Sequence, residues 1–157
     1  MNHVYDILDT LKEELRDNVA VNTVSFGDIT EIDLNKTSIF PLSHIILGTS
    51  RHLGNLIEFD ITVIMADVVD VSNVAESNDE FYGNDNLQDV LNTQFQVGNR
   101  VVNGMRRASR FSENMYDRNY RIVADPTLEP FIDRFSNLLA GYELNFTVQV
   151  PNNSSVC

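Results

Sequence analysis

The stretch that decides the fold is Leu-Ile-Glu-Phe-Asp-Ile-Thr-Val-Ile-Met-Ala-Asp-Val-Val, residues 56–69. Apolar and polar side chains alternate along it, which is the period-two repeat of a β-strand with one buried face. The apolar positions of one face are Ile57, Phe59, Ile61, Val63 and Met65, and the polar positions of the other are Glu58, Asp60 and Thr62. The pattern predicts a long strand that packs one face into a core.

The same alternation returns near the end of the chain and predicts an amphipathic strand over residues 142–150. Its apolar face holds Tyr142, Leu144, Phe146, Val148 and Val150, and its polar face holds Glu143, Asn145, Thr147 and Gln149. Pro151 is expected to end it, because proline cannot donate a ladder hydrogen bond.

Further strands are expected on both sides of the central stretch. The run 38–49 predicts a strand that forms a long hairpin with 56–69 through a turn in 48–55, and Pro41 favours an edge position or a strand start. Short strands are predicted over 21–26 and 120–123, the second followed by a connector containing Pro126 and Pro130.

Two segments carry helical periodicity. The first is apolar at Val4, Ile7, Leu8, Leu11 and Leu15, and the second, over about 85–108, is apolar at Leu87, Val90, Leu91, Phe95, Val101, Val102 and Met105. Gly98 and Gly104 weaken the second helix by about 1 kcal/mol each relative to alanine, and a kink is possible there. The pattern predicts a single α+β domain over residues 1–157, with a mostly antiparallel sheet of about 4–5 strands and two main helices.

Composition narrows the functional classes. The chain has 157 residues, a formal net charge of −12 and 43% hydrophobic residues. An acidic surface argues against non-specific binding to duplex nucleic acid or to anionic membranes. The N-terminus does not resemble a signal peptide, and the one cysteine, Cys157, cannot form an internal disulfide, so a reducing compartment is the simplest expectation.

No catalytic, cofactor or metal site is expected. The three histidines, His3, His44 and His52, lack metal-ligand spacing, and adjacent Ser43 and His44 would point to opposite faces of a strand. Glu58 and Asp60 share a strand face, as carboxylates do in some metal-dependent nucleases. No lysine follows to complete such a site, and no Gly-rich phosphate loop occurs.

Charge is divided unevenly along the chain. Residues 52–99 contain nine acids and no lysine or arginine, whereas residues 100–134 contain seven arginines and five acids. Arginine suits interfaces because its planar fork binds carboxylates in pairs. The hypothesis is a head-to-tail contact between identical subunits, in which Arg100, Arg106, Arg107 and Arg110 meet Asp67, Asp70, Glu76, Asp79 and Glu80. The alternative is that the segments touch within one subunit or are only solvated. Several of these acids lie in residues 71–86, which are predicted to form an acidic mobile loop.

Three stretches resemble the tail terminator proteins of tailed bacteriophages, also known as neck or tail-completion proteins. They are Phe40–Ile45 leading into Ile57–Ile61, Asp89–Gln94, and Pro130–Phe135 continuing through Leu139–Glu143 to Val150–Asn152. Tyr142 stands where that family would be expected to have tryptophan.

The resemblance implies a homo-oligomeric ring, usually hexameric, at the head-proximal end of the tail in the virion. It would cap the tail tube protein and join it to the head-side connector protein while DNA passes without being bound. Channel-lining residues would be Glu58, Asp60, Glu143, Asn145 and Gln149, with Thr147 beside them. Another connector or tail-tube ring protein, a small hydrolase or nuclease, and a monomeric binding module using the 71–86 loop remain alternatives.

Overall fold

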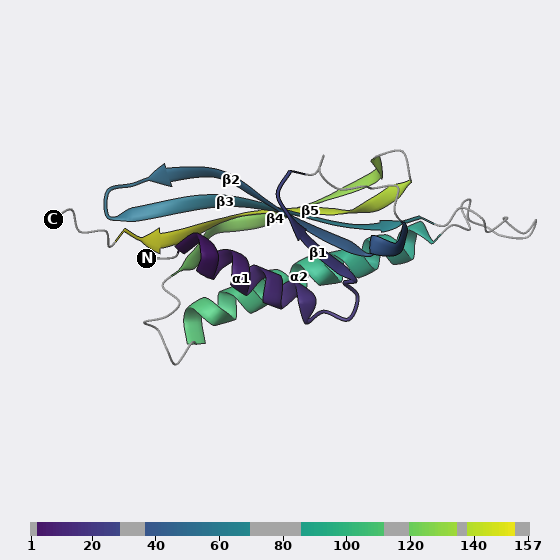
Figure 1. Ribbon diagram of the computed structural model, residues 1–157, viewed down its shortest axis with the longest axis horizontal. Helices are drawn as coiled ribbons and strands as arrows, with labels where there is room; N and C mark the ends of the chain where they lie inside the picture. The colour runs from purple at the N-terminus through teal and green to yellow at the C-terminus, as the bar shows by residue number, and fades with distance from the viewer. Residues whose placement is uncertain (1–2, 29–36, 70–85, 112–119, 135–137, 153–157) are drawn as a thin grey trace, which may run out of the picture.

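The chain folds as an α+β protein in which two helices cover one face of a five-stranded sheet (Figure 1). The computed structural model describes residues 3–28, 37–69, 86–111, 120–134 and 138–152. Its elements are α1 (His3–Arg16), β1 (Thr23–Phe26), the short 3-10 helix η2 (Thr37–Ile39), β2 (Leu42–His52), β3 (Leu56–Val68), α2 (Leu87–Phe111), β4 (Arg121–Arg134) and β5 (Leu139–Pro151). The expected fold class is confirmed.

The sheet has the order β1-β2-β3-β5-β4, and only the β1–β2 pair is parallel. The predicted hairpin is present as β2 and β3, joined by a turn at residues 53–55. β3 pairs with β5 along its whole length, from Leu56 opposite Pro151 to Val68 opposite Leu139. The two strands with the clearest alternation therefore lie side by side in the middle of the sheet.

The main core lies between the helices and the sheet. The alternating apolar positions of β3 and β5 face this core, as their period predicts. The helices contribute Ile7, Leu11, Leu15, Val97, Val101 and Met105, which are almost fully buried and recur at helical spacing.

A second, smaller cluster lies on the other face of the sheet. Because side chains alternate along a strand, Ile64 and Ala66 point away from the helices. They pack with Phe40, Leu42 and Leu139. This face is thus apolar at one end of β3 and polar at the other, where Glu58 and Asp60 lie.

A strand begins at Arg121 as predicted, but the connector predicted after Val123 is wrong. A short strand and a connector were expected, but β4 is one strand from Arg121 to Arg134 and includes both Pro126 and Pro130. Proline is tolerated because β4 is an edge strand, whose outer side needs no donors. The register also shifts between Val123 and Thr127, next to Ala124 with φ of 59°.

Pro41 precedes the first residue of β2, which is an interior strand between β1 and β3. Of the two positions expected for this proline, the strand start is the one observed.

The glycines of α2 mark close approaches rather than an end of the helix, since α2 continues through both. A β-carbon on Gly98 would lie 2.7 Å from Leu128 Cδ2 and 3.0 Å from Met65 Cε. A β-carbon on Gly104 would meet the Glu14 carboxylate of α1. The missing side chains let α2 lie close to the sheet at one point and to α1 at the other.

Candidate functional site

The face of the sheet turned away from the helices, called the open face below, carries a row of polar side chains at the hairpin end. Cross-strand register places Arg51 of β2, Glu58 of β3, Gln149 of β5 and Arg121 of β4 in one line. A second line holds Asp60 and Thr147, and a third holds Thr62 and Asn145. These eight residues are named the polar ladder.

Arg51 is the centre of the polar ladder. Its Nη1 and Nη2 donate to the two carboxylate oxygens of Asp60 at 2.6 and 2.8 Å. Its Nη2 also donates to Glu58 Oε2 at 3.2 Å, and its Nε lies 3.4 Å from the same oxygen. The planar guanidinium fork therefore grips both carboxylates of the β3 face from the neighbouring strand.

Hydrogen bonds continue the ladder across the remaining strands. Gln149 Nε2 donates to Glu58 Oε1 at 3.2 Å, and Arg121 Nε donates to Gln149 Oε1 at 2.9 Å. In the neighbouring lines, the Thr147 hydroxyl donates to Asp60 Oδ1 at 2.8 Å and the Thr62 hydroxyl to Asn145 Oδ1 at 2.7 Å. Four strands are thus joined on one face by side chains as well as by backbone.

The electrostatics follow from these contacts. The hydrogen bond from Arg51, and to a smaller extent that from Thr147, holds the pKa of Asp60 below its ordinary value of 3.8. The same pairing raises the pKa of Arg51. Two carboxylates, Glu58 and Asp60, are matched by two guanidinium groups, Arg51 and Arg121, so the polar ladder carries no net charge at neutral pH.

Arg51 is the functional-site residue that sequence reasoning missed. No lysine or arginine follows Glu58 closely along the chain, and the basic partner lies across the hairpin on β2. The signal that would have found it is the predicted hairpin itself, because residues on paired strands face each other across the turn. Its guanidinium occupies the space between the two carboxylates that a nuclease-like metal ion would need.

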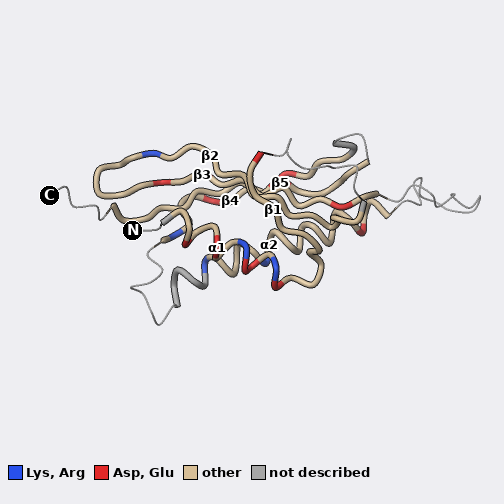
Figure 2. Tube along the Cα trace, in the orientation of Figure 1, with Lys and Arg blue, Asp and Glu red and all other residues tan. Residues whose placement is uncertain are grey.

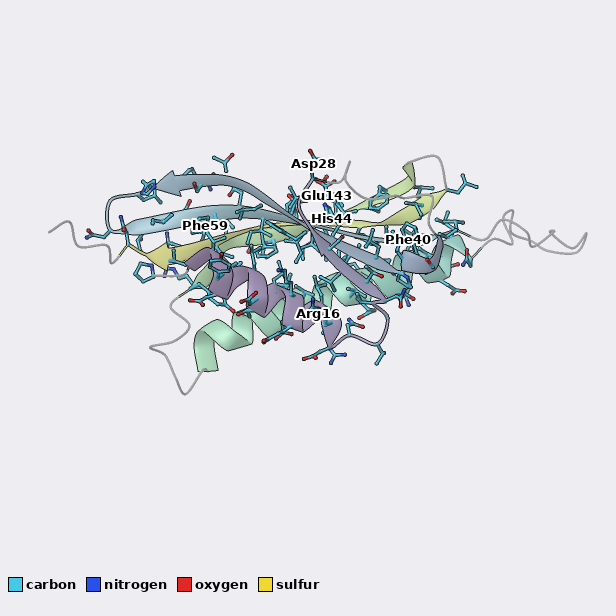
Figure 3. The ribbon with its side chains drawn as sticks, in the orientation of Figure 1. Arg16, Asp28, Phe40, His44, Phe59 and Glu143 are labelled. Carbon is cyan, nitrogen blue, oxygen red and sulfur yellow. The ribbon has the colours of Figure 1, made fainter. Side chains whose placement is uncertain are left out.

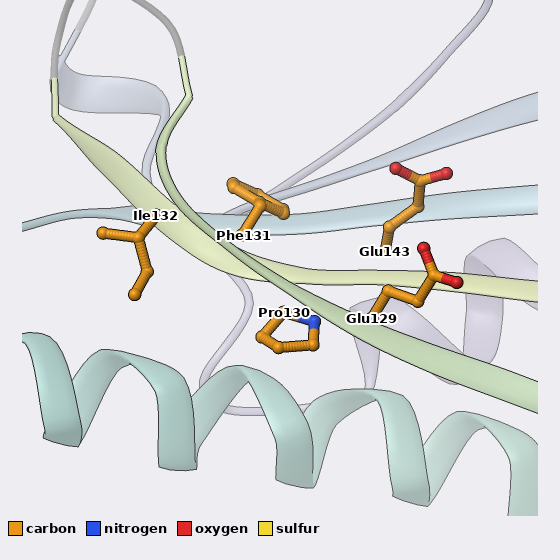
Figure 4. A pocket seen from close by; sticks show the side chains of 5 residues that line it. All are labelled: Glu129, Pro130, Phe131, Ile132 and Glu143. Carbon is orange, nitrogen blue, oxygen red and sulfur yellow. The ribbon is translucent and has the colours of Figure 1, made fainter.

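Farther along the open face, two more acids face each other. Glu129 of β4 and Glu143 of β5 are directly opposed in the register. With Pro130, Phe131 and Ile132 they line a solvent-open pocket of about 340 Å³ (Figure 4). The two carboxylates give this part of the face an acidic character that the polar ladder lacks.

A second pocket of about 350 Å³ lies between the polar ladder and β4. It is lined by Asp60, Ile61, Thr62, Val123, Ala124, Asp125, Thr127, Asn145, Phe146 and Thr147. The acidic positions on β3, β4 and β5 can be followed in Figure 2. All five residues expected to line a channel lie on the open face, and neither α1 nor α2 covers them, although Gln149 is only 8% exposed.

His44 is fully buried and holds β1 to β2. Its Nε2 donates to the Gly27 carbonyl at 2.8 Å, which leaves Nδ1 to accept from the Ser25 hydroxyl at 2.8 Å. Figure 3 shows His44 and Glu143 on the side of the sheet away from the helices. Ser43 and His44 point to opposite faces of β2, since Ser43 lies opposite Met65 of the main core and His44 opposite Ile64. Among the described residues, the buried Ser43 hydroxyl has no hydrogen-bond partner. Both His44 contacts join neighbouring strands, as in a structural histidine.

The structure describes only some of the predicted interface residues. Asp70, Glu76, Asp79 and Glu80 lie outside the described residues, as do the side chains of Arg107 and Arg110 on α2 and nearly all of the 71–86 loop. Arg100 and Arg106 are exposed on α2.

Asp67 is described, and it lies apart from Arg100 within the subunit. It lies near the end of β3, opposite Ala140, which packs with Val90 in the first turns of α2. Arg100 is ten residues farther along that helix, or roughly 15 Å. Burial raises the pKa of Asp67 above its ordinary value of 3.8, and the Val68 amide, which donates to Oδ1 at 2.8 Å, partly offsets this.

Among the described residues, no helix combines the length and apolar character needed to cross a bilayer. No cluster of three or more His, Cys, Asp or Glu side chains suited to a metal ion occurs in the same ranges. Comparison with known proteins finds no matching family model and no matching curated protein.

Proposed function

We propose that this chain is a structural subunit of a tailed-phage virion, a tail terminator or neck protein that assembles into a ring, caps the tail tube and joins it to the head-side connector. The observation that carries the proposal is the division of the sheet into a helix-covered face and an open face with a polar ladder. Subunits arranged around a hole with the open face inward would line that hole with strands, and the helices would form the outside.

The chemistry of the open face supports passage of DNA without binding. Within the polar ladder, Arg51 is paired with Glu58 and Asp60, so its positive charge is compensated before any phosphate approaches. Glu129 and Glu143 add negative charge farther along the same face. Phosphate binding requires uncompensated Lys or Arg, and an acidic wall repels a polyanion.

Contact between subunits would use the exposed arginines of α2. Arg100 and Arg106 lie on the helix surface, and Arg107 and Arg110 follow in the same helix. Their partners would be the acids of residues 70–80 on a neighbouring subunit. The contact is heterologous, so it closes into a ring when the rotation between copies allows.

Mass in solution and negatively stained particles test the proposal. Rings with a central hole about as wide as a DNA duplex support it, and a triple variant, Arg106→Ala with Arg107→Ala and Arg110→Ala, should lose rings while keeping the wild-type thermal unfolding. Arg16→Ala, which removes one exposed positive charge from α1, is the control and should still assemble. Normal rings in the triple variant would disprove the arginine contact. A protein that stays monomeric at every concentration and does not bind isolated tail tubes would disprove the function.

A further inference from the structure

In the described part of the chain, both edges of the sheet lack a pairing strand at the hairpin end. On the β2 side, β1 pairs only with Leu42–Ile45, and the last backbone bond there runs from Gly27 N to Ile45 O at 3.1 Å. β2 continues to His52, and Figure 1 shows the β2–β3 hairpin extending well beyond β1. Among the described residues, no strand pairs with the outer edge of residues 46–52, of which 48–52 are exposed.

The opposite edge, β4, is blocked along most of its length. Pro126 and Pro130 lack backbone donors, and the register shift beside Ala124 bends the strand. Only Arg121–Val123, before the shift, has the regular, proline-free backbone that can receive another strand. Natural sheets use prolines and bulges to prevent edge pairing, and residues 121–123 of β4 have neither.

These two unprotected segments, residues 46–52 of β2 and 121–123 of β4, lie at the same level along the strand direction. The rows of the sheet connect Arg121 to Arg51 through Gln149 and Glu58, and Val123 to the middle of β2 through Thr147 and Asp60. At the opposite end of the sheet, β1 pairs with the edge of β2, and Pro130 lies in β4. Both edges are therefore closed at one end of the sheet and open at the hairpin end.

We infer that the open segment of β2 in one subunit pairs with Arg121–Val123 of β4 in a second copy of this chain, so that the sheet continues from subunit to subunit. This rests on the proposed ring function and names its seam. Strand directions agree with it: β4 runs antiparallel to β2 within the sheet, so the β4 of a copy placed beside β2 in the same orientation forms an antiparallel pair.

The polar ladder fixes the register of this seam. Arg51 and Arg121 lie in one row, so a flush junction would put the two guanidinium groups next to each other across the seam, which is unfavourable. A junction staggered along the strands separates them. Closed sheets of tilted strands need such a stagger, so the requirement is compatible with a ring.

Disulfide trapping between copies tests the seam. In a Cys157→Ser background, Val123→Cys is combined with Thr49→Cys, Arg51→Cys or Leu53→Cys, which sample flush and staggered registers. A disulfide needs β-carbons about 3.5–4.5 Å apart. Phe26→Cys on β1 combined with Val123→Cys is the control, because β1 lies at the closed end. Each protein is oxidised and run on non-reducing gels, and its mass is measured in parallel.

The seam predicts a ladder of covalent multimers for at least one β2 position with Val123→Cys, none for the control, and only dimers when the two single-cysteine proteins are mixed. Rings that give no cross-link at any of the three positions would refute the seam and leave the ring function standing. Covalent dimers from a β2 cysteine alone would show two-fold pairing of β2 edges instead. A protein without multimers or cross-links would refute both the seam and the ring.

Discussion

Glycine-to-alanine replacement adds the same methyl group at Gly98, Gly104 and Gly141, but the structure predicts a different stability change at each. At Gly141 the new β-carbon would meet the backbone carbonyl of Met65 and the Ala66 Cα on the neighbouring strand. This backbone belongs to two interior strands that are hydrogen-bonded to each other, near the Val68–Leu139 end of their pairing, so it cannot move without opening the sheet there. Overpacking costs about 1–3 kcal/mol, and this site belongs at the upper end, about 3 kcal/mol.

At Gly104 the obstruction is the carboxylate of Glu14, the far end of a flexible side chain. Alanine gains about 1 kcal/mol of helix propensity over glycine, and moving Glu14 costs a comparable amount or less. The net change should lie within about 1 kcal/mol of zero. At Gly98 the obstruction is Leu128 and Met65, which are packed in the core, so the cost is intermediate.

The assay is thermal and urea unfolding followed by circular dichroism at 222 nm. For a protein of this size about 1 kcal/mol corresponds to about 2–4 °C in Tm, so Gly141→Ala should lower Tm by about 6–12 °C. Glu14→Ala removes the obstruction at Gly104, so Gly104→Ala should become stabilising by about 1 kcal/mol in that background. The reasoning is refuted if Gly141→Ala is as stable as the wild type, or if Gly104→Ala is the most destabilised of the three.

Two further predictions concern carboxylates whose pKa the fold shifts in opposite directions. Arg51→Gln removes the main cause that lowers the pKa of Asp60. The wild type owes stability to this pair above about pH 4 and loses it as the pH falls through the lowered pKa of Asp60. The urea midpoints of wild type and variant should therefore differ at pH 7 and converge once the pH is below that lowered pKa. A constant difference at all pH values would contradict the ion pair as its cause. Asp67→Asn acts in the other direction, because burial raises the pKa of Asp67 and its ionisation costs stability at neutral pH. The variant keeps an oxygen for the Val68 amide and should be more stable at pH 7, with the gain vanishing below pH 3.8, where the aspartate is protonated in both states. A loss of stability at pH 7 would show that the charged form is favoured.

Local patterns predicted much of the fold because local physics decides them. Alternation identified β3 and β5 and assigned Ile61 and Phe146 to the core and Glu58 and Asn145 to the open face. Helical spacing likewise placed α1 and α2. The prolines of β4 were misread because their effect depends on whether a strand lies at an edge, and strand order is a property of the whole sheet. The parallel pairing of β1 with β2 was not predicted for the same reason.

The candidate site was predicted in part. Its carboxylates were identified from the face they share, but their partner, Arg51, required the hairpin register, including the irregularity between Leu47 and Ser50. The segregation of charge along the chain was read as an interface without knowing which residues fold next to each other. In the structure Asp67 is half-buried and separate from Arg100, so its role in such an interface stays a prediction.

The position of β5 affects how the molecule forms. It is the last described strand, yet it lies in the interior of the sheet between β3 and β4. Its contacts with β3 join residues more than seventy positions apart in sequence. Pairings of such long range must wait for loop closure, which slows folding. We expect β4 to have no stable place until β5 has inserted beside β3. Since β4 also supplies one side of the inferred seam, subunits would become able to associate only after their own sheet is complete.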